Sequence, residues 1–195
     1  MGSSSADARR RIVVGISGAS APHYGIALLR RLRDAGVETH LVVSAGARRT
    51  IAVETDLTVA DVTALADVAY RPGDLAAAIA SGSFLTDGMT VAPCSMKTLA
   101  AVACGYTDDL LARAADVTLK ERRPLVLVAR ETPLSLIHLR NMTAVTEAGA
   151  TVLPPVPAFY HAPVTVQDII DHTVGKILDQ LRVPHRAFTR WGTVT

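Results

Sequence analysis

The sequence predicts an α/β protein: a doubly wound, mostly parallel sheet of the Rossmann or flavodoxin-like type, with helices on both faces. Short apolar runs that suit buried strands alternate with helical periodicity through five or six repeats, and no run of hairpins interrupts them. Turns of small or polar residues follow most of the runs. Because parallel strands end at one edge of a sheet, these turns predict a ligand site there.

The elements follow from the same patterns. Apolar runs predict strands at residues 11–17, 37–44, 88–92, 125–129 and 151–153, with a weaker one at 68–70. Helical periodicity predicts helices at residues 22–35, 45–53, 99–103, 110–119, 135–148 and 166–182, and two short helices within 59–80. Gly36 and Gly149 suit the ends of the helices that precede them.

The length of 195 residues fits one domain, which we expect over residues 11–183. Residues 1–10 are Ser-rich and then charged, and they are expected to be disordered. Residues 184–195 are expected to form a tail that closes the site or contacts a neighbouring subunit. It carries the sole tryptophan, Trp191.

Composition argues against several classes of partner. Twenty Lys and Arg against eighteen Asp and Glu are spread along the chain, so no nucleic-acid surface is expected. No apolar run approaches the ~20 residues of a membrane span. Cys94 and Cys104 are too few for a disulfide framework, and no signal peptide precedes the first strand, which predicts a cytoplasmic protein.

Residues 15–20, Gly-Ile-Ser-Gly-Ala-Ser, join the first strand to a helix. Such a turn lets backbone N–H groups and the Ser20 hydroxyl approach a phosphate at the positive end of the helix dipole. The spacing is not the full dinucleotide fingerprint, so plain helix–strand packing is an equal alternative.

Other polar residues follow later strands. Ser44 ends the second strand, residues 95–98 belong to the turn that leads from the third strand into the helix at 99–103, and Arg130 ends the strand at 125–129. With Ser20 they form one predicted site for an anion or the polar edge of a ring system. The alternative for Arg130 is a surface ion pair with Glu131.

Several charged or reactive residues have plainer explanations. Arg122 and Arg123 suit solvated turn charges, and Glu54 suits a solvated helix end. Cys94 suits a small buried residue better than a nucleophile. Arg113 and Lys120 are seven residues apart, two helical turns, and so share a face.

The loop at residues 154–161 is stiffened by three prolines in four residues and presents Phe159, Tyr160 and His161. With other segments, this loop resembles the flavin prenyltransferase (UbiX) family of the homo-oligomeric, flavin-containing decarboxylase-like flavoproteins. The resembling segments are residues 15–20, 53–56, 92–98, 113–133, 137–142 and 154–161. They occur in order with compatible spacing across residues 11–191.

The resemblance implies a homo-oligomeric flavoprotein, often a dodecamer, that needs no metal. Its members join the dimethylallyl group of dimethylallyl phosphate to N5 and C6 of reduced FMN, and the prenylated FMN is passed to a UbiD-type decarboxylase. By position, FMN would be held by Gly18, Ala19, Ser20, Ser44, Ser95, Met96, Lys97, Thr98 and Arg130. The prenyl-phosphate pocket would contain Glu54, Arg113, Lys120, Arg130, Glu131, Tyr160 and Lys176, closed by Trp191. Within these sets the catalytic group would be Ser20, Glu54, Arg113, Lys120, Glu131 and Trp191.

Two departures from the family pattern stand out. Ala21-Pro22-His23 replaces a Gly-Ala pair after Ser20, which reshapes the turn beside the flavin or adds a titratable group. Lys176 stands where an Arg is usual, so the charge is kept but the two-pronged grip on phosphate is lost.

Two other functions stay open at this stage. One is an FMN-dependent decarboxylase of a small acid, although the Pro-x-Met-Asn segment of that group is absent from residues 93–96. The other is a non-catalytic FMN carrier or partner subunit, for which the altered turn at residues 21–23 is the best argument.

Overall fold

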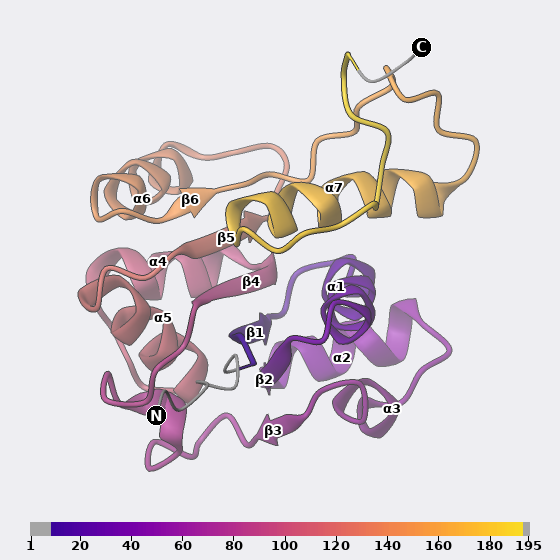
Figure 1. Ribbon diagram of the computed structural model, residues 1–195. Helices are drawn as coiled ribbons and strands as arrows, with labels where there is room; N and C mark the ends of the chain where they lie inside the picture. The colour runs from indigo at the N-terminus through magenta and orange to yellow at the C-terminus, as the bar shows by residue number, and fades with distance from the viewer. Residues whose placement is uncertain (1–8, 193–195) are drawn as a thin grey trace, which may run out of the picture.

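The computed structural model describes residues 9–192, which form a six-stranded sheet in the order β3-β2-β1-β4-β5-β6 (Figure 1). The strands are β1 (Arg11–Ile16), β2 (Glu38–Val43), β3 (Val68–Tyr70), β4 (Gly88–Cys94), β5 (Leu125–Ala129) and β6 (Thr151–Val152). Every pairing is parallel, so the predicted fold class is confirmed. The strand order reverses between β1 and β4, and such a switch point is where open α/β sheets bind ligands.

The helices lie close to their predicted positions. They are α1 (His23–Asp34), α2 (Ala45–Glu54), α3 (Val59–Thr63), α4 (Met96–Cys104), α5 (Leu110–Lys120), α6 (Leu136–Glu147) and α7 (Val166–Gln180), with a 3₁₀ turn at Ala78–Ala80. The largest difference is at α4, which begins three residues before the predicted Leu99. It starts early because Ser95 caps it, its hydroxyl accepting a hydrogen bond from the Thr98 N–H.

Two apolar cores cover the two faces of the sheet. One packs α1 and α7 against β1, β2 and β5, with Leu29 and Val174 fully buried. The other packs α4 and α5 against β4 and β5, with Leu99 and Leu111 at its centre. All residues of β4 and β5 are buried, as the continuous apolar run at 125–129 predicts for strands covered on both faces.

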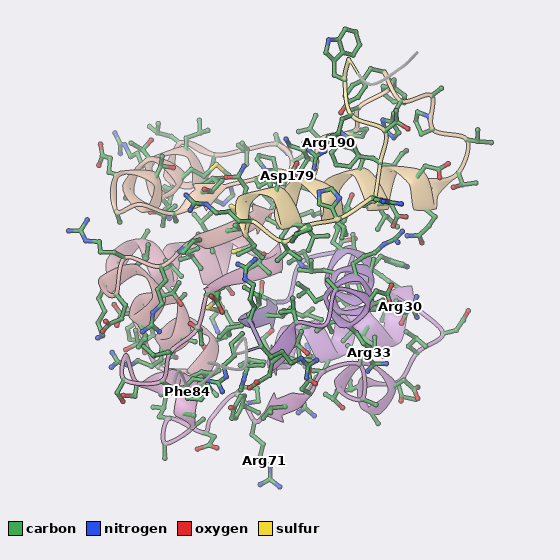
Figure 2. The ribbon with its side chains drawn as sticks, viewed as in Figure 1. Arg30, Arg33, Arg71, Phe84, Asp179 and Arg190 are labelled. Carbon is green, nitrogen blue, oxygen red and sulfur yellow. The ribbon has the colours of Figure 1, made fainter. Side chains whose placement is uncertain are left out.

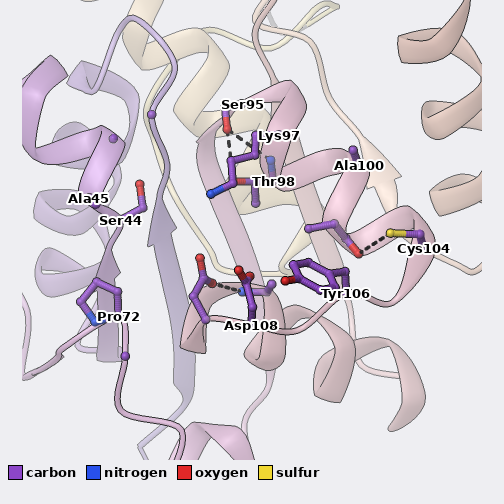
Figure 3. Close-up of a pocket in the computed structure, with 16 residues that line it drawn as sticks. Ser44, Ala45, Pro72, Ser95, Lys97, Thr98, Ala100, Cys104, Tyr106 and Asp108 are labelled. Carbon is purple, nitrogen blue, oxygen red and sulfur yellow. Dashed lines mark hydrogen bonds between the residues drawn. The ribbon is translucent and has the colours of Figure 1, made fainter.

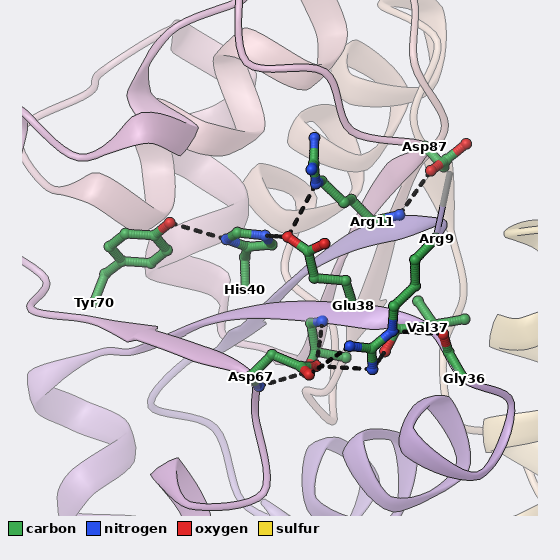
Figure 4. A network of polar contacts seen from close by, with 10 residues as sticks. Arg9, Arg11, Gly36, Val37, Glu38, His40, Asp67, Tyr70 and Asp87 are labelled. Atoms are coloured by element: carbon green, nitrogen blue, oxygen red, sulfur yellow. Dashed lines mark hydrogen bonds and ion pairs between the residues drawn. The ribbon is translucent and has the colours of Figure 1, made fainter. Parts of the chain in front are cut away.

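A polar network fastens the amino edge of the sheet (Figure 4). Arg9 pairs with Asp67 at 2.8 Å, and Asp67 also accepts a hydrogen bond from the Thr39 N–H. Arg11 pairs with Glu38 at 2.9 Å. Residues 1–8 of the expected disordered segment lie outside the described residues, whereas Arg9 is held by these contacts.

The chain ends in a tail that returns along α7 (Figure 1). Arg190 of the tail donates to both carboxylate oxygens of Asp179 on α7, at 2.7 and 3.2 Å, and Figure 2 shows the two side chains together. His185 lies 3.0 Å from the same carboxylate. Among residues 9–192 no helix is both long and apolar enough to cross a membrane.

Candidate active site

The turns after β1, β2 and β4 border a cavity of about 610 Å³ at the carboxyl edge of the sheet (Figure 3). Five of its lining residues were predicted for the flavin: Gly18, Ser44, Ser95, Lys97 and Thr98. Ala19, Ser20, Met96 and Arg130, also predicted there, are not among the residues that line it. The cavity volume is in the range of small-molecule cofactor sites.

Two glycines shape the floor of this cavity. A Cβ on Gly18 would lie 2.9 Å from the Cα of Gly46, and a Cβ on Gly46 would lie 3.0 Å from the Cα of Gly18. The two turns therefore approach backbone to backbone, which no larger residue allows. This contact brings the start of α2 against the first turn and leaves room for a ligand beside both.

Two capped helix starts border the cavity. The Ser44 hydroxyl accepts from the Ala47 N–H at 3.1 Å, and the Ser95 hydroxyl accepts from the Thr98 N–H at 3.3 Å. The remaining N–H groups of each first turn, with Lys97, provide donors and positive potential. Such a set fits the phosphate and the polar edge of a flavin.

A buried serine ties the first and third turns together. Ser17 donates its hydroxyl proton to the carbonyl of Pro93 at 3.0 Å and accepts from the Ser95 N–H at 2.7 Å. Sequence reasoning missed this role, because the small-residue turn gave no sign of which serine faces inward.

Ser20 and Glu54 meet at the edge of this region. Glu54 Oε2 accepts a hydrogen bond from Ser20 Oγ at 3.0 Å and another from the Ala21 N–H at 2.7 Å. Glu54 is the last residue of α2. Its side chain is half-buried, and its carboxylate contacts the turn between β1 and α1. His23 and Glu54 also line a second, smaller cavity of about 420 Å³. The plain explanation of Glu54 as a solvated helix end is therefore wrong.

Arg130 follows β5 at the same edge, where its N–H donates to the Cys94 carbonyl. Burial raises the pKa of Tyr24, and this rise is partly offset by a hydrogen bond to Thr173 and by the nearby positive charge of Arg130. The positive charge of Arg130 therefore acts on the Tyr24 side chain, which α1 carries. Arg130 and Glu131 form no ion pair with each other, and Glu131 Oε1 accepts from the adjacent Thr132 N–H.

Arg113 and Lys120 are both on α5 and are engaged in local contacts. Arg113 on α5 donates to the Ala80 carbonyl and pairs with Asp116, while Lys120 pairs with the adjacent Glu121. Lys120 ends α5 only five residues before β5 begins, so it is at the amino edge of the sheet. Within one chain Lys120 is therefore separate from Ser20 and Glu54, whereas Arg113 lies near the start of α5, beside Ala112 of the cavity lining.

Arg123 also lies at that edge, where it donates to the carbonyls of Gly82 and Phe84 at 2.7 and 2.9 Å. The expectation of a solvated turn charge is wrong for Arg123, because its guanidinium fixes the loop before β4. Cys94 is a buried small residue as expected, and burial raises the pKa of its thiol to about 12. Such a thiol is a poor nucleophile.

A third group of predicted residues gathers where the proline-rich loop meets the tail. Tyr160 and Trp191 pack edge to face with ring centroids 5.6 Å apart, and both line a cavity of about 580 Å³. Lys176 is on α7, 3.7 Å from Asp179.

The sequence did not predict the remaining residues that line the cavity of about 610 Å³. They are Ala45, Gly46, Pro72, Gly73, Ala100, Ala101, Cys104, Tyr106, Asp108, Asp109 and Ala112. Asp109 carried a usable signal, because it precedes an apolar periodic run and caps α5 by accepting from the Ala112 N–H at 2.8 Å. Gly46 carried none, since its role depends on the turn that faces it.

Comparison with known proteins identifies the family. The flavoprotein family model matches residues 2–180. Flavin prenyltransferase UbiX of Escherichia coli strain K12 is 56% identical over 93% of this chain and 98% of that protein. The chain belongs to the flavin prenyltransferase (UbiX) family of flavoproteins. The resemblance predicted from the sequence is thereby confirmed.

Two solved structures of the family share the fold in detail. AnUbiX (PadA1), crystallised with FMN and dimethylallyl pyrophosphate, is 55% identical, with a TM-score of 0.94 over 96% of this chain and 100% of its own. A dodecameric FMN-dependent UbiX-like decarboxylase from Escherichia coli O157:H7 is 54% identical, with a TM-score of 0.91 over 93% of this chain and 98% of its own. The cavity with its glycine floor and capped helix starts fits FMN, the cofactor named for both.

Proposed function

We propose that this chain transfers the dimethylallyl group of dimethylallyl phosphate to N5 and C6 of reduced FMN, giving prenylated FMN for a UbiD-type decarboxylase. The observation that carries the proposal is the pairing of Ser20 with Glu54 beside a flavin-sized cavity, in a chain 56% identical to a flavin prenyltransferase. A carboxylate and a hydroxyl in hydrogen-bond contact are suited to moving protons as a ring closes.

FMN would be held by the first, second and third turns and by Arg130. These residues are Gly18, Ala19, Ser20, Ser44, Ser95, Met96, Lys97, Thr98 and Arg130. Reduced FMN, when bound, supplies N5 as the nucleophile that displaces phosphate from the allylic carbon. The chain contributes the orientation of the ring and the exclusion of water from the reacting atoms.

The leaving phosphate would be bound by Arg113, Lys120, Arg130, Tyr160 and Lys176. Charge and hydrogen-bond donors placed where negative charge develops lower the barrier to departure. Because Lys120 is at the amino edge of the sheet, separate from Ser20 within one chain, we infer that a neighbouring subunit supplies it. The dodecameric state of the O157:H7 relative supports this inference.

Glu54 and Ser20 would relay the proton released at C6. Glu131 follows Arg130 at the end of β5 and belongs to the same proposed pocket. Trp191 would cover the prenyl group and offer its π face to positive charge on the allylic carbon. In this chain the indole already lies against Tyr160, one of the proposed phosphate ligands.

The test is to incubate the purified protein anaerobically with reduced FMN and dimethylallyl phosphate and to weigh the extracted flavin by mass spectrometry. A gain of one dimethylallyl unit is expected, and dimethylallyl pyrophosphate serves as the second substrate. Bound but unmodified FMN with both substrates would overturn the proposal. It would favour an FMN-dependent decarboxylase of a small acid or a non-catalytic carrier.

Two further expectations belong to this proposal. A single catalytic domain over residues 11–183 with a tail over 184–195 is supported by the ion pair that joins Arg190 to α7. A cytoplasmic location is supported by the unpaired thiols of Cys94 and Cys104, which suit a reducing compartment.

A further inference from the structure

His172 on α7 belongs to a packed aromatic group that the proposed function leaves unexplained. Its side chain is nearly buried, with an exposed fraction of 7%. Its ring stacks on His161 of the proline-rich loop, with centroids 4.9 Å apart and planes at 9°. Phe188 of the tail packs against it at 4.7 Å. The group thus joins the loop, the helix and the tail.

The polar contact of His172 inside this group is with Tyr160. Its Nε2 lies 3.0 Å from Tyr160 Oη. Burial, reinforced by the neighbouring His161 and the charge of Lys176, lowers the pKa of His172, so the ring is neutral near pH 7. A neutral imidazole carries one N–H, and its position decides the direction of the hydrogen bond.

The two directions have different consequences for an anion. If Tyr160 donates to Nε2, the phenol proton is used and none is left for a phosphate oxygen. If Nε2–H donates to Oη, the phenol keeps its proton for the ligand and becomes a better donor, because hydrogen bonds in a chain polarise one another.

We propose that His172 is a positioning residue for phosphate binding: its Nε2–H donates to Tyr160 Oη and turns the phenol proton toward the prenyl phosphate. The inference rests on the proposed function, which makes Tyr160 a phosphate ligand. Lys176 is one helical turn beyond His172 on the same face of α7, so the helix presents the oriented phenol and the ammonium group together. The edge-to-face contact with Trp191 fixes the phenol ring from a second side.

A double-mutant cycle tests this role. His172→Leu removes the donor, whereas His172→Gln keeps an N–H₂ donor, and both are made with Tyr160 intact and with Tyr160→Phe. We expect His172→Leu to lower kcat/KM for dimethylallyl phosphate roughly ten- to thirty-fold, mainly through KM, as expected for one hydrogen bond to a charged group. His172→Gln should recover most of this loss, and neither change should matter once Tyr160 is Phe.

Each other outcome overturns the inference or its basis. A loss that is equally large in the Tyr160→Phe background means that His172 acts only through packing. If His172→Leu does not fold, judged by circular dichroism and FMN binding, His172→Gln carries the test, and a tenfold loss in it contradicts the proposal. Wild-type protein that makes no prenylated flavin refutes the proposed function itself, whereas active protein indifferent to Tyr160→Phe refutes only the phosphate role of Tyr160.

Discussion

Ser20 Oγ lies 3.0 Å from Glu54 Oε2, although the two residues are 34 positions apart in the chain. The same carboxylate oxygen accepts the Ala21 N–H at 2.7 Å, so Glu54 is fixed against the turn that begins α1. A charged acceptor held by two donors is pre-oriented for proton transfer, and it also fastens the end of α2 to the first turn.

Glu54→Gln should therefore separate chemistry from structure. The amide oxygen still accepts from Ser20 and from the Ala21 N–H, but it cannot take a proton. We expect FMN binding to be kept and the rate of prenylated-flavin formation to fall by ~10² or more, the usual contribution of a positioned acid–base group. Single-turnover measurements of flavin mass check this. A normal rate would remove Glu54 from proton transfer.

Ala21 occupies a backbone conformation that favours glycine. Its φ is 67°, in the left-handed region that costs an L-residue ~1–2 kcal/mol. Ala21→Gly relieves that strain. Glycine also makes the unfolded chain more flexible, which lowers the free energy of unfolding by ~0.4–1 kcal/mol and offsets part of the gain. We expect a net gain of about 0.5–1 kcal/mol and a rise in Tm of about 1–4 °C.

The matched control is Ala19→Gly in the same turn. Ala19 is buried and has no positive φ, so glycine there should lower Tm. Scanning calorimetry of the two variants beside the wild type gives the comparison. A fall in Tm for Ala21→Gly would mean that the methyl group packs favourably enough to outweigh the strain.

Cys104 can test whether FMN occupies the cavity proposed for it, without any assay of activity. It is exposed and lines the cavity of about 610 Å³, whereas Cys94 is buried with its pKa raised to about 12 by burial. A thiol reagent should label one cysteine per native chain, and Cys104→Ser should abolish the labelling. Saturating FMN should slow it several-fold. Labelling at an unchanged rate would place FMN elsewhere.

The sequence predicted best those parts whose signal is local. The run at 125–129 is apolar throughout because both faces of β5 are covered, so five residues suffice to recognise the strand. The start of α4 was missed because Ser95 reads as part of a loop until its hydroxyl is seen to cap the Thr98 N–H. The contact of Gly18 with Gly46 joins two turns that no periodicity relates.

The site was harder to predict because its members come from distant segments. The family resemblance picked out Arg113 and Lys120 for the phosphate pocket, yet a residue pattern does not say which subunit supplies each residue. In one chain Arg113 pairs with Asp116 and Lys120 pairs with Glu121, and Lys120 is at the opposite edge of the sheet from Ser20. The contribution of a neighbouring subunit can be inferred only from the three-dimensional arrangement.

The tail should be held to α7 in a pH-dependent way. Burial raises the pKa of Asp179, but hydrogen bonds from Arg190 and His185 lower it by more, so its net pKa is below the ordinary value. A carboxylate whose pKa is lowered in the docked state stabilises docking at pH values above its ordinary pKa of ~3.9. This stabilisation is lost as the pH falls through the lowered pKa. The contribution of Asp179 to docking should therefore be constant from pH 8 to 5 and weaken below about pH 4.

The sole tryptophan, Trp191, makes the docking measurable. Fluorescence anisotropy of FMN-free protein should fall in Asp179→Asn at pH 7, because the tail loses its anchor and the indole moves more freely. Asp171→Asn, also on α7, is the matched control, since it breaks the ion pair with Arg31 of α1 without touching the tail. Equal anisotropy in wild type and Asp179→Asn would show that ring contacts alone hold Trp191.

Lys176 offers a change expected to improve the enzyme. Its ammonium lies 3.7 Å from Asp179 and, in the proposed pocket, would give phosphate a single point of charge, whereas the planar guanidinium of Arg binds two phosphate oxygens at once. Lys176→Arg should lower KM for dimethylallyl phosphate about five-fold, the effect of ~1 kcal/mol from one added hydrogen bond, with kcat little changed. Lys176→Met, which removes the charge but keeps the stem, should raise KM. Steady-state kinetics at saturating reduced FMN measure both, and an unchanged KM in the two variants would place Lys176 outside the phosphate pocket.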